Sequence, residues 1–148
     1  NETVVWMMSG LVLLTAAFFG HSLGNVFIEP EGRVVVTRVV IILGNLYVLY
    51  ACVGAFACFL STRSNSRGRA VGGTVGMLLV FFLWNFLGQY WGPAEDFAFL
   101  NIFTYYKPMP ILSDGVVPWR DMVVLSIVAG VFWGLGGIHF DRRDISTL

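Results

Sequence analysis

Residues 34–60 read VVVTRVVIILGNLYVLYACVGAFACFL and carry one charged side chain, Arg38, near their start. About 20 consecutive apolar residues are enough for a helix to cross the roughly 30 Å hydrocarbon core of a bilayer. The stretch does not alternate between polar and apolar residues, as a half-buried strand would. We therefore predict a membrane-spanning helix here, and the rest of the fold follows from it.

The whole chain shares this apolar character. Of its 148 residues, 57% are hydrophobic and only 12% are charged. A soluble domain carries about 25% charged residues, and a chain this short has little interior in which to bury the excess apolar surface. The formal net charge is zero, which gives no reason to expect nucleic acid as a partner. The composition predicts an all-α integral membrane protein in contact with lipid.

Three further segments are long and apolar enough to cross the bilayer. The four predicted spans are residues 4–28, 34–60, 71–91 and 122–140. Strands are not expected, because the runs are long and lack regular turn signals. The chain is thus interpreted as a single transmembrane domain, 1–148.

Basic residues set the predicted orientation, because cytoplasmic flanks of spans are enriched in Lys and Arg. Five of the nine basic residues fall in the 61–70 connection and the tail, which four spans place on one side: Arg63, Arg67, Arg69, Arg142 and Arg143. We interpret them as an inner-face anchor. Both chain ends are then cytoplasmic, in a plasma membrane.

The connection between the third and fourth spans is too apolar for an ordinary exposed loop. Within it, Phe99, Ile102, Phe103 and Tyr106 have the spacing of one helical face. About ten residues cannot cross the core, so an amphipathic outer segment at about 94–112 should lie at the interface or re-enter the membrane. Phe99, Phe103 and Tyr106 are its candidate functional residues.

Small residues recur at four-residue spacing in three of the spans. The ridges are Ala16–Gly20–Gly24, Gly72–Gly76 and Ser126–Gly130–Gly134. Such ridges let helix backbones approach closely in lipid, where the hydrophobic effect does not drive helix association. They predict helix contacts within a bundle, with contact between two copies of the chain as the alternative.

The polar side chains inside the spans are few. Asn45 lies midway along the second span, while Asn85 and Gln89 share one face of the third. In hydrocarbon each needs a partner or water, so they either join helices or line a substrate path or interface. Arg38 is interpreted as an anchor whose charged end reaches the membrane surface.

No catalytic, cofactor or metal site is predicted in this chain. Every Asp and Glu lies at a span end or in a connection, and no G-x-x-x-x-G-K-[ST] nucleotide-binding motif occurs. The two histidines, His21 and His139, lie near opposite ends of their spans, so one haem iron could not reach both.

The order of these features resembles the C-terminal half of the permease subunits of type 2 ABC exporters. Two spans joined by a tight outer turn precede a basic loop, a third span, the outer stretch YYKPMPIL (105–112) and a last span. The chain then closes on FDRRDI, in which Phe140, Arg142, Arg143, Asp144 and Ile145 match the ending typical of that family. The resemblance covers nearly the whole chain.

The resemblance implies a six-span permease of which this chain holds the third to sixth spans, with two spans upstream of Asn1. It also implies a bacterial or archaeal membrane, a partner ATPase subunit that binds ATP and Mg²⁺, and a second permease copy or homologue. The expected function is a substrate path that opens by alternating access. Asn85 and Gln89 would lie near the permease–permease interface.

Two other functions remain open. The chain could be a non-transporting scaffold subunit of a larger membrane complex, which the small-residue ridges and the lack of buried acids would favour. It could also be a membrane enzyme, although Asp96, Lys107 and Asp114 are too scattered in the outer connection to suggest a mechanism. The sequence does not specify a transported substrate.

Overall fold

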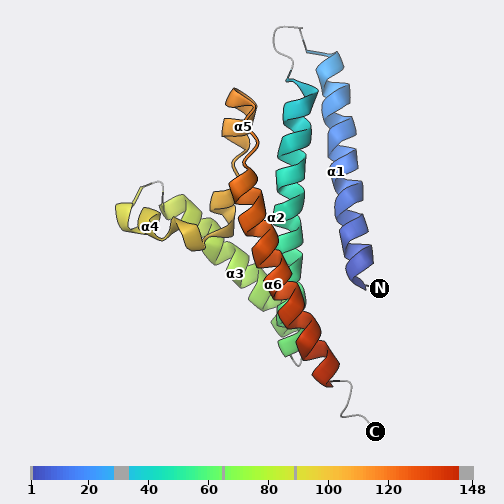
Figure 1. The fold of residues 1–148 in the computed structure, drawn as a ribbon, viewed down its shortest axis with the longest axis vertical. Coiled ribbons are helices and arrows are strands. Elements are labelled where there is room, and N and C mark those ends of the chain that lie inside the picture. Colours follow the sequence, from blue (N-terminus) through green and yellow to red (C-terminus); the bar gives the residue numbers. More distant parts are fainter. Residues whose placement is uncertain (1, 29–33, 65, 89, 144–148) are drawn as a thin grey trace.

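The computed structural model describes residues 2–28, 34–64, 66–88 and 90–143, and within these ranges the chain is helical with no strand. Four long helices carry the fold (Figure 1): α1 (Glu2–Val26), α2 (Val36–Arg63), α3 (Arg67–Leu87) and α6 (Trp119–Arg143). The connection between α3 and α6 holds four short elements: α4 (Gly92–Asp96), η2 (Ala98–Leu100), η3 (Ile102–Tyr105) and α5 (Pro108–Asp114).

The described residues contain four helices that are long and apolar enough to cross a membrane, which confirms the predicted fold class. These helices expose large apolar side chains along their length, such as Phe19 at 62%, Leu79 at 56% and Val131 at 54%. Contiguous apolar surface on this scale is incompatible with water as the solvent. The protein is an all-α membrane protein.

The ends of the helices differ from the predicted spans by a few residues. The largest difference is in the third span, which was predicted to reach Trp91, whereas α3 ends at Leu87 with Gly88 as its C-cap. Gly88 still has right-handed helical dihedrals, and its amide donates a 2.9 Å hydrogen bond to the Trp84 carbonyl oxygen. The predicted tight turn at 29–33 lies outside the described residues.

Helices α1 and α2 run antiparallel. They pack through two aromatic rings, one from each helix, and each ring lies against a glycine of the opposite helix. The Trp6 indole stacks on the Tyr50 ring with centroids 4.0 Å apart, and the two planes are 8° from parallel. A Cβ atom built on Gly54 would lie 2.0 Å from the Trp6 ring, and one built on Gly10 would lie 2.4 Å from the Tyr50 ring. Both glycines are therefore required for these two helices to lie so close together.

Helices α2 and α6 form the centre of the molecule and make its most extensive helix–helix contact. Their buried side chains form a small core of Leu49, Cys52 and Leu125. Further along, the Phe132 ring lies edge-on to Phe56 with centroids 5.2 Å apart. The interface between α2 and α6 is thus apolar over most of its length.

Near the end of α6, Gly136 is buried against the backbone of Phe59, and a Cβ there would lie 3.7 Å from the Phe59 Cα. Helix α3, in contrast, tilts away from α2 and α6 and meets α2 mainly near their connection (Figure 1). Gly73 of α3 lies beside the Leu60 side chain, where a Cβ would be 3.5 Å away. An apolar cavity lies between α3 and the other two helices, and residues of the α3–α6 connection form part of its wall.

The predicted small-residue ridges do not form contacts within this chain. A Cβ added to any of their glycines would meet nothing within 4 Å: Gly20, Gly24, Gly72, Gly76, Gly130 and Gly134. The prediction of ridge contacts within the bundle is therefore wrong for the described residues. Close packing uses Gly10, Gly54 and Gly136 instead, because a glycine allows close approach only where a partner side chain or backbone lies opposite it. Contact between two copies of the chain stays a prediction.

Candidate functional site

The candidate site is the outer segment, residues 94–112, together with the side chains that hold it. The sequence predicted one short helix through Phe99, Ile102, Phe103 and Tyr106, and this prediction is wrong. The structure has two separate 3₁₀ turns, η2 and η3, which are divided at Asn101 by extended backbone with φ −94° and ψ 119°. The regular α-helices lie on either side of these turns: α4 ends at Asp96 before η2, and α5 begins at Pro108 after η3.

Asn101 explains the break between the two turns. Its side chain is 2% exposed, and its Oδ1 accepts a 3.0 Å hydrogen bond from the Phe103 amide, which caps η3. Its Nδ2 donates a 2.8 Å hydrogen bond to the carbonyl oxygen of Phe81 on α3. Asparagine favours such local side-chain-to-backbone bonds over continuation of a helix. One residue thus ends η2, begins η3 and fastens the segment to α3.

The segment re-enters the space between the helices. Residues of η3 and Tyr106 pack against the buried core of Leu49, Cys52 and Leu125. At 1.5 Å of rise per residue, Leu125 lies about 9 Å along α6 from its first residue, Trp119. Phe81 lies about 9 Å from the end of α3 by the same measure. The segment thus packs between the helices, and whether it lies at the interface or re-enters the membrane stays a prediction.

Irregular backbone at this depth needs hydrogen-bond partners from the protein, because lipid supplies none. The Tyr105 hydroxyl donates a 2.7 Å bond to the Phe99 carbonyl oxygen. Asn45 of α2 is completely buried, and its Nδ2 donates a long 3.5 Å bond to the Tyr105 carbonyl oxygen, while its Oδ1 has no partner. Asn45 therefore supports the backbone of the segment, about 13 Å along α2 from Val36.

Arg38 holds the other end of the segment. Its Nη1 donates to the carbonyl oxygen of Leu112 and, at 3.1 Å, to that of Ser113, which are among the last residues of α5. A cation is favourable there, because the free carbonyl groups give a helix C-terminus partial negative charge. Gly115 follows with φ 70°, and a Cβ on it would lie 3.4 Å from the Arg38 Nε. The predicted surface anchor is thus a side chain that binds the end of α5.

An ion pair links the segment to α6. The Lys107 Nζ lies 3.1 Å from the Asp121 Oδ2, with side chains 47% and 18% exposed. Asp121 lies in the first turn of α6, where the helix dipole also favours a negative charge. Contacts from α2, α3 and α6 therefore all converge on residues 99–113.

The predicted site residues differ in how far they are buried and in what they contact. Phe103 and Tyr106 are half-buried against the core, whereas Phe99 is 63% exposed and lines an apolar cavity. Burial raises the pKa of the Tyr106 phenol above its ordinary value. Asn85 is half-buried on α3, and Gln89 lies outside the described residues. Of the three polar candidates, only Asn45 is seen to contact the outer segment.

The predicted inner-face anchor is only partly described. Arg63 and Arg69 are exposed, and the Arg63 guanidinium lies 5.8 Å from the centroid of the Phe59 ring. The side chains of Arg67, Arg142 and Arg143 lie outside the described ones, and so do residues 144–148. The 61–70 connection and the end of α6 lie at the same end of the molecule (Figure 1).

Two residues of the site were missed by sequence reasoning. Arg38 carried a usable signal, because a single charge inside an apolar span is a candidate functional residue by default. Asn101 carried a weaker one, as a good helix cap within a long apolar connection. Their partners are backbone carbonyl groups on distant elements, which leave no pattern in the sequence.

The described side chains of His, Cys, Asp and Glu do not form a group of three or more that could hold a metal ion. No protein-family model, curated protein or solved structure shows significant similarity to the chain. A functional assignment therefore depends on the geometry of the outer segment and on the order of features along the sequence.

Proposed function

We propose that this chain is the membrane-spanning permease part of an ATP-driven exporter and forms a substrate path with a second permease copy or homologue. The resemblance of its feature order and its FDRRDI ending to type 2 ABC permeases supports this assignment. A separate subunit would hydrolyse ATP, with Mg²⁺ as its metal, and the membrane would be bacterial or archaeal.

The observation that carries the proposal is the attachment of the outer segment to three spanning helices. Asn45 and Arg38 hold it to α2, Asn101 holds it to α3, and the Lys107–Asp121 pair holds it to α6. A change in tilt of any of these helices would therefore move the segment with it. An exporter that works by alternating access needs this kind of link between its spans and its outer opening.

In this mechanism, closure of the ATPase subunits would tilt the spans from the cytoplasmic side. The basic 61–70 connection and the tail would lie over the ATPase. The outer segment would follow the spans and open the path outward, while Asn85 and Gln89 would lie near the path or at the permease–permease interface. Energy enters only through the partner, so the chain alone has no enzymatic role in the cycle.

A scaffold subunit is the second candidate, and the open small-residue ridges favour it. The glycines at 20, 24, 72, 76, 130 and 134 all face open space, which leaves three helices with unpartnered ridges. In lipid such ridges are suited to contact with helices of other subunits.

Copurification and ATP hydrolysis distinguish the two candidates. Tagged full-length protein is isolated from its own membrane in mild detergent, bound subunits are identified by mass spectrometry, and ATP hydrolysis is measured in the reconstituted complex. We expect an ATPase subunit and activity that depends on it. A complex that contains other membrane subunits and no ATPase would favour the scaffold and exclude the exporter.

Orientation is tested separately by single-cysteine labelling. Cys52 and Cys58 are replaced by serine, and Ser64→Cys is introduced in the 61–70 connection. A membrane-impermeant maleimide should label this cysteine in inverted vesicles and not in intact cells. Labelling in intact cells would reverse the proposed orientation.

A further inference from the structure

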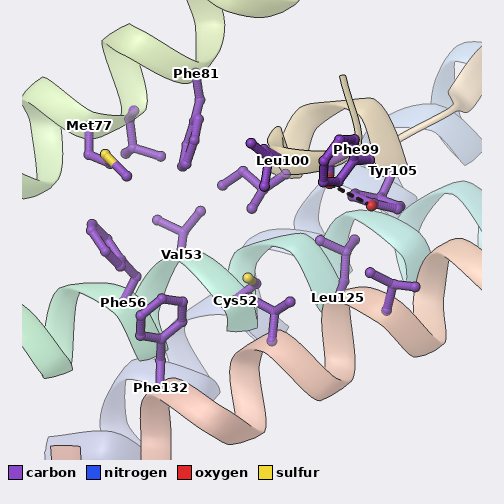
Figure 2. Close-up of a pocket in the computed structure, with 14 residues that line it drawn as sticks. Cys52, Val53, Phe56, Met77, Phe81, Phe99, Leu100, Tyr105, Leu125 and Phe132 are labelled. Atoms are coloured by element: carbon purple, nitrogen blue, oxygen red, sulfur yellow. Dashed lines mark hydrogen bonds between the residues drawn. The ribbon is translucent and has the colours of Figure 1, made fainter. Parts of the chain in front are cut away.

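An apolar cavity of about 240 Å³ lies beneath the outer segment, in the space left by the tilt of α3. Figure 2 shows side chains from three helices pointing into it: Val53 and Phe56 from α2, Met77 and Phe81 from α3, and Phe132 from α6. Leu100 and Phe99 of the outer segment complete the wall. The cavity is therefore bounded by α2, α3 and α6, with the outer segment covering it as a roof, and it is partly open to the outside.

The wall offers almost no hydrogen bonding to an occupant. Its side chains with a hydrogen-bonding atom are Cys52, Met77, whose thioether is only a weak acceptor, and Tyr105. The Tyr105 hydroxyl already donates to the Phe99 carbonyl oxygen at 2.7 Å (Figure 2), and a thiol is a weak donor. A ligand with several polar groups would lose its hydrogen bonds on entry, which costs about 1–3 kcal/mol for each unsatisfied group. The occupant must therefore be a hydrocarbon.

The size of the cavity gives a second constraint. Apolar cavities of about 150 Å³ in protein cores stay dry and bind benzene or xenon. A cavity of 240 Å³ accommodates several more carbon atoms than benzene. An acyl chain meets both constraints, since it has no hydrogen-bonding groups and can extend out of the cavity toward the bilayer.

The exposure of the two outer-segment residues that cover the cavity also indicates a hydrocarbon occupant. Phe99 and Leu100 are 63% and 62% exposed in the isolated chain, although their segment re-enters between the helices. Apolar side chains at this depth are covered by lipid or by protein. At this depth the surrounding solvent consists of phospholipid chains, which are the most abundant hydrocarbon available to fill the space.

We propose that this cavity binds one acyl chain of a bilayer phospholipid. The chain lies between α3 and the α2–α6 pair, beneath the outer segment, and replaces side-chain contacts that the tilt of α3 removes. The bound acyl chain fixes the positions of Phe99 and Leu100 relative to α3. This site is independent of whether the protein exports a substrate.

Photo-crosslinking tests the proposal on the full chain. The protein is reconstituted in phosphatidylcholine vesicles that contain a small fraction of phosphatidylcholine with a diazirine midway along one chain. After irradiation, adducts are mapped by mass spectrometry. We expect them to be concentrated on Phe56, Met77 and Phe81. Adducts distributed evenly over outward-facing residues such as Leu79 and Val131, or absent from the cavity wall, would overturn the proposal.

Two matched variants make the test specific to the cavity. Val53→Trp fills it and should lower crosslinking to the wall about tenfold, because the indole occupies the volume that the acyl chain would take. Val40→Trp makes the same change on α2 at a position that is 52% exposed and outside the cavity wall, and it should have no effect. Equal crosslinking in the two variants would exclude the cavity as the site.

A variant that enlarges the cavity distinguishes loss of lipid binding from misfolding of the protein. Phe81→Ala removes a ring from the wall and should increase crosslinking to Phe56 and Met77, which a loss of structure would not do. Circular dichroism confirms the helix content of each variant. An excess of unlabelled phosphatidylcholine should dilute the adducts. Selective displacement by a free fatty acid instead would show that the site does not belong to a bilayer phospholipid.

Discussion

The side-chain amide of Asn101 donates a 2.8 Å hydrogen bond to the backbone carbonyl oxygen of Phe81, twenty residues earlier in the chain. The bond joins the irregular outer segment to α3 at a point about 9 Å before the end of that helix. Asn101 is almost fully buried, so neither water nor lipid can replace this partner. The bond is one of the main contacts that position the outer segment against α3.

Replacing Asn101 with leucine should lower the free energy of unfolding by about 1–2 kcal/mol, because both the bond to Phe81 and the cap on η3 are lost. Unfolding in mixed micelles by titration with sodium dodecyl sulfate, followed by circular dichroism, measures the change. The matched control is Asn85→Leu, which replaces a half-buried asparagine on the same helix as Phe81. If the two variants lose equal stability, the bond has no special role.

Replacing Arg38 with methionine should release the end of α5, because the carbonyl groups of Leu112 and Ser113 lose a charged donor. Hydrogen exchange of the Gly115 amide, which bonds to the Ile111 carbonyl oxygen at 3.0 Å, should become about tenfold faster. Arg38→Lys should give an intermediate rate, since lysine keeps the charge and loses the planar fork.

Arg120→Met is the control for this experiment, because Arg120 is exposed at the start of α6. It should leave exchange in α5 unchanged. Unchanged exchange in Arg38→Met would show that Arg38 acts only as a surface anchor, as the sequence alone suggested.

Replacing Gly54 with alanine should destabilise the protein by about 1–3 kcal/mol, because the new Cβ would lie 2.0 Å from the Trp6 ring and must displace α1. Gly20→Ala is the matched control on α1, where an added Cβ meets nothing within 4 Å. Thermal unfolding in detergent measures both. A neutral Gly54→Ala combined with a destabilising Gly20→Ala would indicate that the ridge, and not the aromatic stack, holds α1.

The Lys107–Asp121 ion pair should contribute less to the free energy of unfolding than the buried contacts do, since its side chains are partly exposed. Lys107→Met should cost about 0.5 kcal/mol, as is typical for exposed ion pairs. Asp121→Asn should cost more, because it also removes the favourable charge from the first turn of α6. The double variant measured against the two single ones gives the energy of the pair. If Lys107→Met lowers the free energy of unfolding more than Asp121→Asn does, this prediction is wrong.

The fold could be predicted from the sequence because lipid acts on each helix separately. A run such as 34–60 is long and apolar enough to cross a bilayer without any tertiary partner, and its backbone is satisfied within the helix itself. The four spans were therefore predicted to within a few residues. The burial of part of the outer connection could be expected for the same reason, since its apolar residues exceed what a surface loop can carry.

The contacts between helices could not be predicted in the same way. Gly54 and Gly72 are both glycines in apolar spans, and only the first has an aromatic ring opposite it. Whether a small residue serves close packing depends on its partner, which lies on another helix. The predicted ridges were repetitive along the sequence, whereas the actual contacts use glycines without that spacing.

The sequence by itself determined that this chain holds four helices long and apolar enough to cross a membrane, with an apolar connection between the last two, because hydrophobicity and length act locally. Only the tertiary structure decided how that segment is held. Arg38 and Asn45 of α2 donate hydrogen bonds to its carbonyl groups, and its own Asn101 donates one to the Phe81 carbonyl oxygen of α3. Hydrogen bonds to the backbone depend on the position of a carbonyl oxygen and not on the identity of its residue, so the folded chain alone reveals them.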